Sequence, residues 1–247
     1  VILYRPTGES GDFEKANFPI GVEGGKTSTC PTQNLMEAYD MKDGTPFVWN
    51  NQSNPYDNRD PRMKYTIVCN EMKWPVDPVE IWEGGTNGLP LQNATTTGYY
   101  LKKYVNNTIS FEAGSTVTKK QHNWVLFRYG EILLNYAEAM INAFHDPNYK
   151  DAVYNMSARE AVNQIRGRTN ISLPGFPSDI TEKDFVKRLK NERRVELASE
   201  GHRFWDVRRW KELGQTANIY GVKITKNNEV ISYEKFLLET RAVTDNM

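Results

Sequence analysis

The most regular pattern of apolar and polar positions lies in the second half of the chain. Apolar residues recur there at three- and four-residue steps, the spacing typical of amphipathic helices. One run predicts a helix over residues 124–144, with apolar positions at Tyr129, Ile132, Leu133, Tyr136, Met140, Ala143 and Phe144. A second run predicts a helix over residues 151–167, with apolar positions at Tyr154, Ala158, Ala161, Val162 and Ile165. The short link between the two runs predicts an antiparallel helix pair.

A third helix is predicted over residues 181–201. Thr181 and Asp184 form a T-x-x-D start. Gly201 is a natural end, because glycine adopts the left-handed conformation without strain. On a helical wheel, the apolar stripe of this helix also carries charged residues: Phe185, Val186, Leu189 and Leu197 share it with Glu192, Arg193, Glu196 and Glu200. The helix therefore directs ionised groups towards its own core.

Charges on a buried helix face must be paired, because removal of one partner leaves a desolvated ion. A short helix after Gly201 adds further charges: Phe204, Val207 and Trp210 would form its buried face, with Arg203 and Arg209 in reach of Asp206. Metal sites in helical bundles use Glu-x-x-His pairs, which this stretch lacks. We interpret these charges as a structural ion network in preference to a catalytic or metal site.

The first half of the chain shows little periodicity. A short helix is predicted over residues 32–39, and strands over residues 1–4 and 65–69. Residues 99–104 are expected to be extended. The segment about Asn227-Asn228 is expected to form either a small hairpin or a polar excursion. The segments between these elements are rich in Gly, Pro, Asn and Thr, which predicts a large loop-rich region.

Two tryptophans, Trp74 and Trp82, lie in the long predicted loop at residues 70–98. Their flat apolar faces suit the C–H faces of sugar rings, and the indole N–H can serve a hydroxyl group. Loops also carry binding residues more often than the elements that they join. The alternative is that both indoles fill space beneath the loop, since large aromatic side chains are usually well buried.

Composition narrows the possible functions. The chain has 247 residues, and its 31 basic and 31 acidic residues cancel. A neutral chain without a basic run gives no electrostatic footprint for nucleic acid. No apolar run is long enough to span a bilayer. Cys30 and Cys69 are the only cysteines, and the sequence leaves open whether they form a disulfide or two buried thiols.

Five segments together resemble the SusD/RagB family, in the order that the family uses. They are PTQNLMEAYDMKDG, NRDPR, TTGYYLKKYV, RYGEILLNYAEAM and NERRVELASEGHRFWDVRRW. The chain is similar to the C-terminal portion of such a protein, so we expect either a fragment or a processed form, and the sequence leaves open which. The resemblance implies a mainly α fold with tetratricopeptide-type helices, a large loop-rich region and a few short strands. Residues 1–120 would form the loop-rich ligand-binding layer, and residues 121–247 the helical part of one continuous domain.

The resemblance also implies a function. The expected protein is a non-catalytic glycan-binding protein on the extracellular face of the outer membrane. It would pass oligosaccharide to a SusC-like, TonB-dependent transporter and would reach the membrane only through a lipid anchor outside this chain. No cofactor and no metal are implied. Arg59, Asp60 and Arg62 match a family motif that we interpret as a structural clamp between the loop and residues 65–69.

The expected ligand residues are the loop aromatics, with two asparagines as partners for sugar hydroxyls: Trp74, Trp82, Trp49, Tyr56, Asn51 and Asn54. Three alternatives stay open at this stage. The chain could be a tetratricopeptide-like interaction scaffold, although only one helix pair is visible. It could bind another nutrient, such as a peptide. It could be a glycosidase, for which Asp57 and Glu71 lie near the tryptophans in the sequence.

Overall fold

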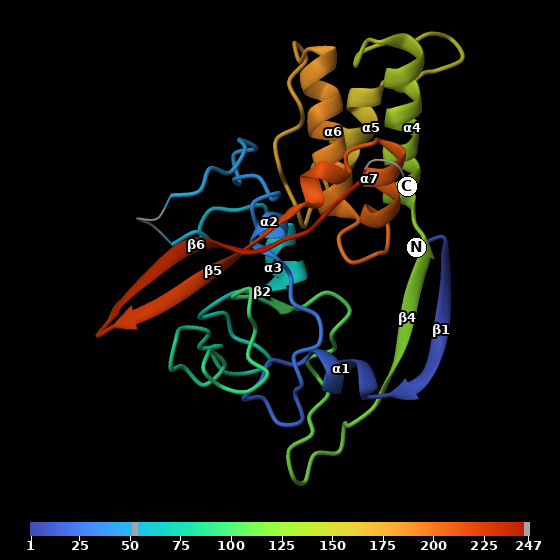
Figure 1. Ribbon diagram of the computed structural model, residues 1–247. Coiled ribbons are helices and arrows are strands. Elements are labelled where there is room, and N and C mark those ends of the chain that lie inside the picture. The colour runs from blue at the N-terminus through green and yellow to red at the C-terminus, as the bar shows by residue number, and fades with distance from the viewer. Residues whose placement is uncertain (51–53, 245–247) are drawn as a thin grey trace.

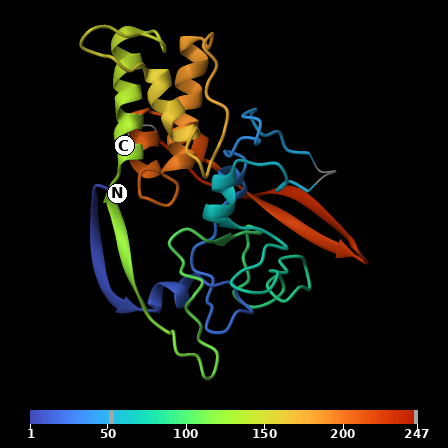
Figure 2. The same ribbon diagram turned by 180° about the vertical axis from the view of Figure 1, so that it is seen from behind.

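The computed structural model describes residues 1–50 and 54–244. Its described residues form an upright group of helices above a layer of loops and short strands (Figure 1). The same two parts are seen from behind, with the α4–α6 helices side by side and a long two-stranded ribbon projecting from the lower layer (Figure 2). Each part has its own apolar core.

The helical part contains α4 (Tyr129–Phe144), α5 (Ala158–Arg166) and α6 (Glu182–Glu196). The side chain of Thr181 accepts a hydrogen bond from the Asp184 amide and starts α6, as the T-x-x-D pattern predicts. Ser157 and Glu160 form a capping box that starts α5. The core between the three helices contains Leu133, Leu134, Ala137, Met140, Ile141, Ala161, Val162, Ile165, Phe185 and Leu189.

Two of the predicted helix starts are wrong. Residues 124–127 belong to strand β4 (Lys120–Phe127), which pairs antiparallel with β1 (Leu3–Ser10). Residues 151–157 are not helical, because the Asp151 carboxylate accepts hydrogen bonds from the Val153 and Tyr154 amides in a local turn. Tyr154 is consequently exposed instead of buried on a helix face.

The segment after α6 turns back beneath the helices. It forms α7 (Arg203–Arg209) and a short 3-10 helix, η1 (Leu213–Thr216). Val207 is buried and Trp210 is half-buried, but Phe204 and Trp205 are exposed. The prediction that Phe204 is buried is therefore wrong: its ring lies on the surface beneath the Arg208 guanidinium.

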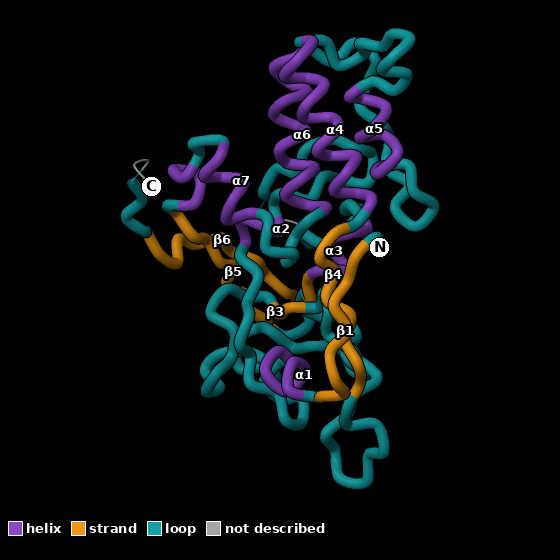
Figure 3. Tube along the Cα trace, turned by 90° about the vertical axis from the view of Figure 1, so that its right-hand side faces the viewer, coloured by secondary structure: helices purple, strands orange, loops and turns teal. Residues whose placement is uncertain are grey.

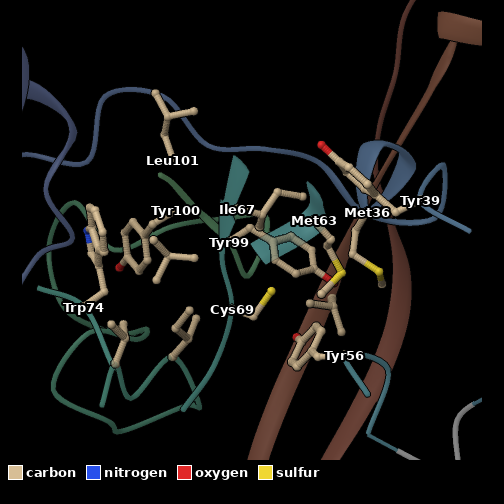
Figure 4. Packing of buried hydrophobic residues seen from close by; sticks show 14 of the residues in the cluster. Met36, Tyr39, Tyr56, Met63, Ile67, Cys69, Trp74, Tyr99, Tyr100 and Leu101 are labelled. Atoms are coloured by element: carbon tan, nitrogen blue, oxygen red, sulfur yellow. The ribbon is translucent and has the colours of Figure 1, made fainter. Parts of the chain in front are cut away.

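The loop-rich layer contains only short elements. They are α1 (Asp12–Asn17), α2 (Gln33–Met36), α3 (Pro61–Thr66), β2 (Ile67–Val68) and β3 (Tyr100–Leu101). The predicted strand at 65–69 is thus the end of a helix followed by a two-residue strand. Buried aromatic and sulfur-containing side chains from these elements and from the loops between them pack against one another in the core of this layer (Figure 4).

A long hairpin completes the layer. Strands β5 (Asn218–Asn227) and β6 (Val230–Thr240) join at the asparagine pair that the sequence indicated. Val222, Ile224 and Tyr233 of the hairpin enter the core of the loop-rich layer. Gly98 has a φ of +82°, and a Cβ there would lie 2.4 Å from the Val222 carbonyl oxygen, so a loop packs directly on β5.

The expectation of a mainly α fold holds only for the helical part. More than half of the described residues lie outside helices and strands, and the six strands form three separate two-stranded sheets (Figure 3). The division at residue 120 stays a prediction. The structure places the hairpin from the second half of the chain in the core of the loop-rich layer.

Candidate ligand-binding site

A network of buried ion pairs lies where the two parts of the fold meet. Glu192 accepts hydrogen bonds from Arg62 and from Arg166, the latter at 2.7 Å. Glu196 accepts from Arg62 at 3.0 Å and Arg128 at 2.6 Å. Arg62 also forms an ion pair with Asp60 at 2.7 Å, and Arg168 with Glu196 at 2.7 Å. Charges from the loop-rich layer, β4–α4 and α5 thus converge on one face of α6.

These glutamates are held as carboxylates. Burial raises the pKa of Glu196, but the charges of Arg128, Arg62 and Arg168 outweigh burial and lower the pKa to about 2. The pKa of Glu192 is also lowered, because Arg62 and Arg166 offset its burial. A carboxyl group that stays ionised at neutral pH has no proton to donate, and these oxygens are already bonded to guanidinium groups. The arrangement is that of a structural network rather than of a catalytic pair.

The other predicted members of the network make separate contacts. Glu200 pairs with Lys103 at 2.6 Å and Arg128 at 2.7 Å. Asp206 accepts from Arg193 and Arg209. Arg203, which was expected near Asp206, instead donates to the Gln215 amide oxygen at 3.2 Å. Arg59 donates to the backbone carbonyl oxygens of Pro55, Met36 and Tyr39 and so fastens the NRDPR segment to α2.

Two of the expected ligand residues are core side chains. Trp74 is 6% exposed and Tyr56 is 4% exposed, and both belong to the core of the loop-rich layer. Figure 4 shows Trp74 at one end of this core and Tyr56 near its other end. Lys102 lies over the Trp74 ring at 5.1 Å. A ligand on the surface therefore cannot stack on either ring as the structure stands.

The other expected residues lie nearer the surface. Trp82 is half-buried, and the Lys226 ammonium group lies 4.4 Å from its ring centroid. Trp49 is half-buried on a different loop, where its ring meets the edge of Phe47 at 6.4 Å. The Asn54 side chain accepts a hydrogen bond from the Tyr56 amide. Asn51 lies outside the described residues.

A cleft of about 460 Å³ lies between α6 and the segment at residues 37–47, and no prediction from sequence identified it. Its walls carry more basic than acidic side chains: Lys183, Lys187, Arg188, Lys190, Arg194, Arg166 and Arg203 against Glu37, Asp40, Glu192 and Glu212. Phe47, the neighbour of Trp49, lines the same cleft. The sequence does contain a signal for it, because residues 183, 187, 190 and 194 are basic at helical spacing.

Two other kinds of site have no support in the described part of the chain. No group of three or more His, Cys, Asp or Glu side chains among residues 1–50 and 54–244 is arranged to hold a metal ion. Within the same residues, no helix combines the length and apolar character needed to cross a membrane. Both cysteines of the chain are free thiols in the structure.

The fold and its cleft define a loop-rich binding domain mounted on helices, and comparison with known proteins gives the family. The family model described as the SusD family matches residues 6–244, and the chain belongs to that family. Members of the family are binding proteins without catalytic activity, found at the outer membrane and cell surface of Bacteroidetes. The expectation of a SusD-like fold is confirmed.

Individual relatives agree with this assignment. A solved SusD-like protein from Bacteroides fragilis superimposes with a TM-score of 0.78 and 25% identity, covering 99% of this chain and 49% of its own. A SusD-like carbohydrate-binding protein from the same species gives 0.73 and 26%, covering 89% and 44%. A SusD-like protein from Formosa agariphila is 37% identical over 91 residues, which is 34% of this chain and 16% of the relative. The chain thus spans about half the length of the solved relatives.

Proposed function

We propose that this protein is a non-catalytic glycan-binding protein of the cell surface, and that it passes captured oligosaccharide to a TonB-dependent outer-membrane transporter. Membership of the SusD family supports the proposal. A solved relative that covers 89% of this chain is described as a SusD-like carbohydrate-binding protein. The extracellular face and the transporter partner are parts of the proposal.

The observation that carries glycan binding in this chain is the placement of Trp82. It lies on an irregular loop, packs one side against the core of the loop-rich layer and remains partly exposed. The exposed Lys226 side chain lies over the Trp82 ring, and by rotating aside it can donate to a sugar hydroxyl while the indole supplies an apolar face. An apolar plane beside a hydrogen-bond donor is the combination that a pyranose ring requires. Trp49, beside the cleft, is the second proposed contact.

Calorimetric titration against a panel of soluble polysaccharides tests the proposal. We expect at least one polysaccharide to bind, and Trp82→Ala to weaken that binding by about tenfold, since stacking on an aromatic side chain contributes ~1–2 kcal/mol. The matched control is Trp205→Ala, which removes another exposed tryptophan from α7. Equal loss in both variants would contradict the assignment to Trp82, and absence of binding to any polysaccharide would contradict the function.

A further inference from the structure

The cleft beside α6 contains cations that form no direct ion pair with a carboxylate of the described residues. Its four acidic side chains are each engaged: Glu192 by Arg62 and Arg166, Asp40 by Arg166 at 3.1 Å, Glu212 by Lys190 at 2.6 Å, and Glu37 by Lys235 at 2.8 Å. Four basic side chains of the cleft have no such partner: Lys183, Lys187, Arg194 and Arg203. Among residues 1–50 and 54–244, none of these four has a carboxylate within 4 Å.

Arg194 makes this excess of positive charge costly. It is half-buried, and its guanidinium group donates to the backbone carbonyl oxygen of Asn34 at 2.7 Å. Burial and the charge of nearby Arg203 lower the pKa of Arg194 to about 10. A partly desolvated cation next to a second cation is unfavourable unless an anion lies between them. The whole chain has a formal net charge of zero, so this excess is local.

The cleft is the right size for part of a ligand. Its volume of about 460 Å³ falls in the ~300–1,000 Å³ range of ligand pockets. Asn191 also lines the cleft; its amide nitrogen donates to the Ala38 carbonyl oxygen, and its amide oxygen can accept a hydrogen bond from a sugar hydroxyl. The edge-on contact between Phe47 and Trp49 connects the cleft with a proposed sugar contact. A chain of sugars lying here would meet cations, an amide and an aromatic side chain in turn.

We propose that the cleft selects acidic glycans, with one sugar carboxylate or sulfate ester held by Arg194 and Arg203 and others along the glycan held by Lys183 and Lys187, nearer the start of α6. The proposal rests on the glycan-binding function above and specifies the class of ligand. Sugar carboxylates and sulfate esters share the same chemistry here, because both present anionic oxygens to guanidinium and ammonium groups. Their binding should weaken as salt increases, since Lys183 and Lys187 are exposed and screened.

The test compares matched polysaccharides that differ in charge. Polygalacturonate is set against its methyl ester, and dextran sulfate against dextran, by calorimetric titration at low and high salt. We expect the charged member of at least one pair to bind at least about tenfold more tightly than its neutral partner. The first pair reports carboxylate recognition, and the second reports sulfate recognition. Equal affinity for charged and neutral members in both pairs would overturn the proposal.

Charge variants locate the interaction. Lys183→Gln/Lys187→Gln/Arg203→Gln should lose about tenfold in affinity for the acidic ligand. Lys64→Gln/Lys119→Gln/Lys120→Gln removes the same charge outside the cleft and should stay within about twofold. An equal loss in both variants would overturn the assignment to the cleft. If neutral glycans bind through Trp82 and charged glycans bind no more tightly, the proposed glycan-binding function stands and the preference for acidic ligands is wrong. No binding to any glycan would reject both.

Discussion

The guanidinium group of Arg62 lies 3.0 Å from the carboxylate of Glu196, although 134 residues separate them in the chain. Both side chains are almost fully buried, with exposed fractions of 7% and 2%. Arg62 belongs to α3 in the loop-rich layer, and Glu196 ends α6 in the helical part. The contact between the two parts of the fold is therefore made by charge as well as by apolar packing.

Replacement of Arg62 by methionine should destabilise the protein strongly. Glu192 and Glu196 would each lose a buried cationic partner, and breaking a buried ion pair from one side costs about 3–5 kcal/mol. The free energy of unfolding from urea titration measures the effect. The control is Lys150→Met, which breaks the exposed pair with Glu160 and should cost less than about 1 kcal/mol. Similar losses in both variants would contradict a structural role for the buried network.

Stability should fall in acid partly through Glu196. Its pKa is about 2 in the folded protein against a usual value of 4.5, so the unfolded chain takes up the proton first as pH falls. The stabilisation is complete above about pH 4.5 and is lost between pH 4.5 and 2. This loss is on the order of 3 kcal/mol.

Urea midpoints between neutral pH and pH 2 measure this dependence. Glu196→Gln cannot take up a proton, so its free energy of unfolding should decline less steeply than that of the unchanged protein across this range. Glu239→Gln serves as the comparison, because that carboxylate is exposed and pairs only with the exposed Arg241 side chain. An unchanged slope in Glu196→Gln would show that its carboxylate is not held by the surrounding arginines.

The two tryptophans of the long loop should separate core packing from binding. Trp74→Ala removes a buried indole and should cost about 3–5 kcal/mol of unfolding free energy. Trp82→Ala should cost less, since the ring is only half-buried, yet it should be the variant that weakens glycan binding. Trp74→Phe keeps an aromatic ring in the core and should retain both fold and affinity. Loss of affinity in folded Trp74→Phe would place Trp74 at the ligand.

The two cysteines should differ in reactivity towards iodoacetamide. Cys69 is fully buried, and burial raises its pKa to about 12. Cys30 is half-buried, and burial also raises its pKa. Because the thiolate is the nucleophile, Cys30 should react slowly in the folded protein and Cys69 only after unfolding. Peptide mass spectrometry measures this, and a disulfide-linked peptide would contradict the free thiols.

Local signals predicted the elements whose ends are set by their own residues. Thr181 and Asp184 located the start of α6, and the asparagine pair located the turn between β5 and β6. The start of α5 was also readable, since Ser157 and Glu160 have capping-box spacing. The predicted helix began too early, at residue 151, because Tyr154 fits the apolar spacing of the helix face.

Other features depend on partners far away in the sequence. Residues 124–127 form a strand because β1 lies beside them, and no local pattern shows that pairing. The charged stripe on α6 was visible, but its partners Arg62, Arg128 and Arg166 come from other elements. The exposure of the loop tryptophans also depends on contacts with distant residues, so the local sequence does not predict it. Trp74 and Trp82 lie in the same predicted loop at residues 70–98, and only the packing of that loop shows that the first is buried and the second is partly exposed.

The forked contacts of Arg62 also have a consequence for how this protein can change. A guanidinium group forms good hydrogen bonds only in a narrow range of angles. Its contacts therefore restrict movement of α3 relative to α6 more than apolar packing alone would. The loops around α3 are thereby mounted on a fixed base. Mutations can change the length or the side chains of those loops while α3 keeps its position against α6. If the loops bind a ligand as proposed, their specificity can change while the contact between α3 and α6 stays the same.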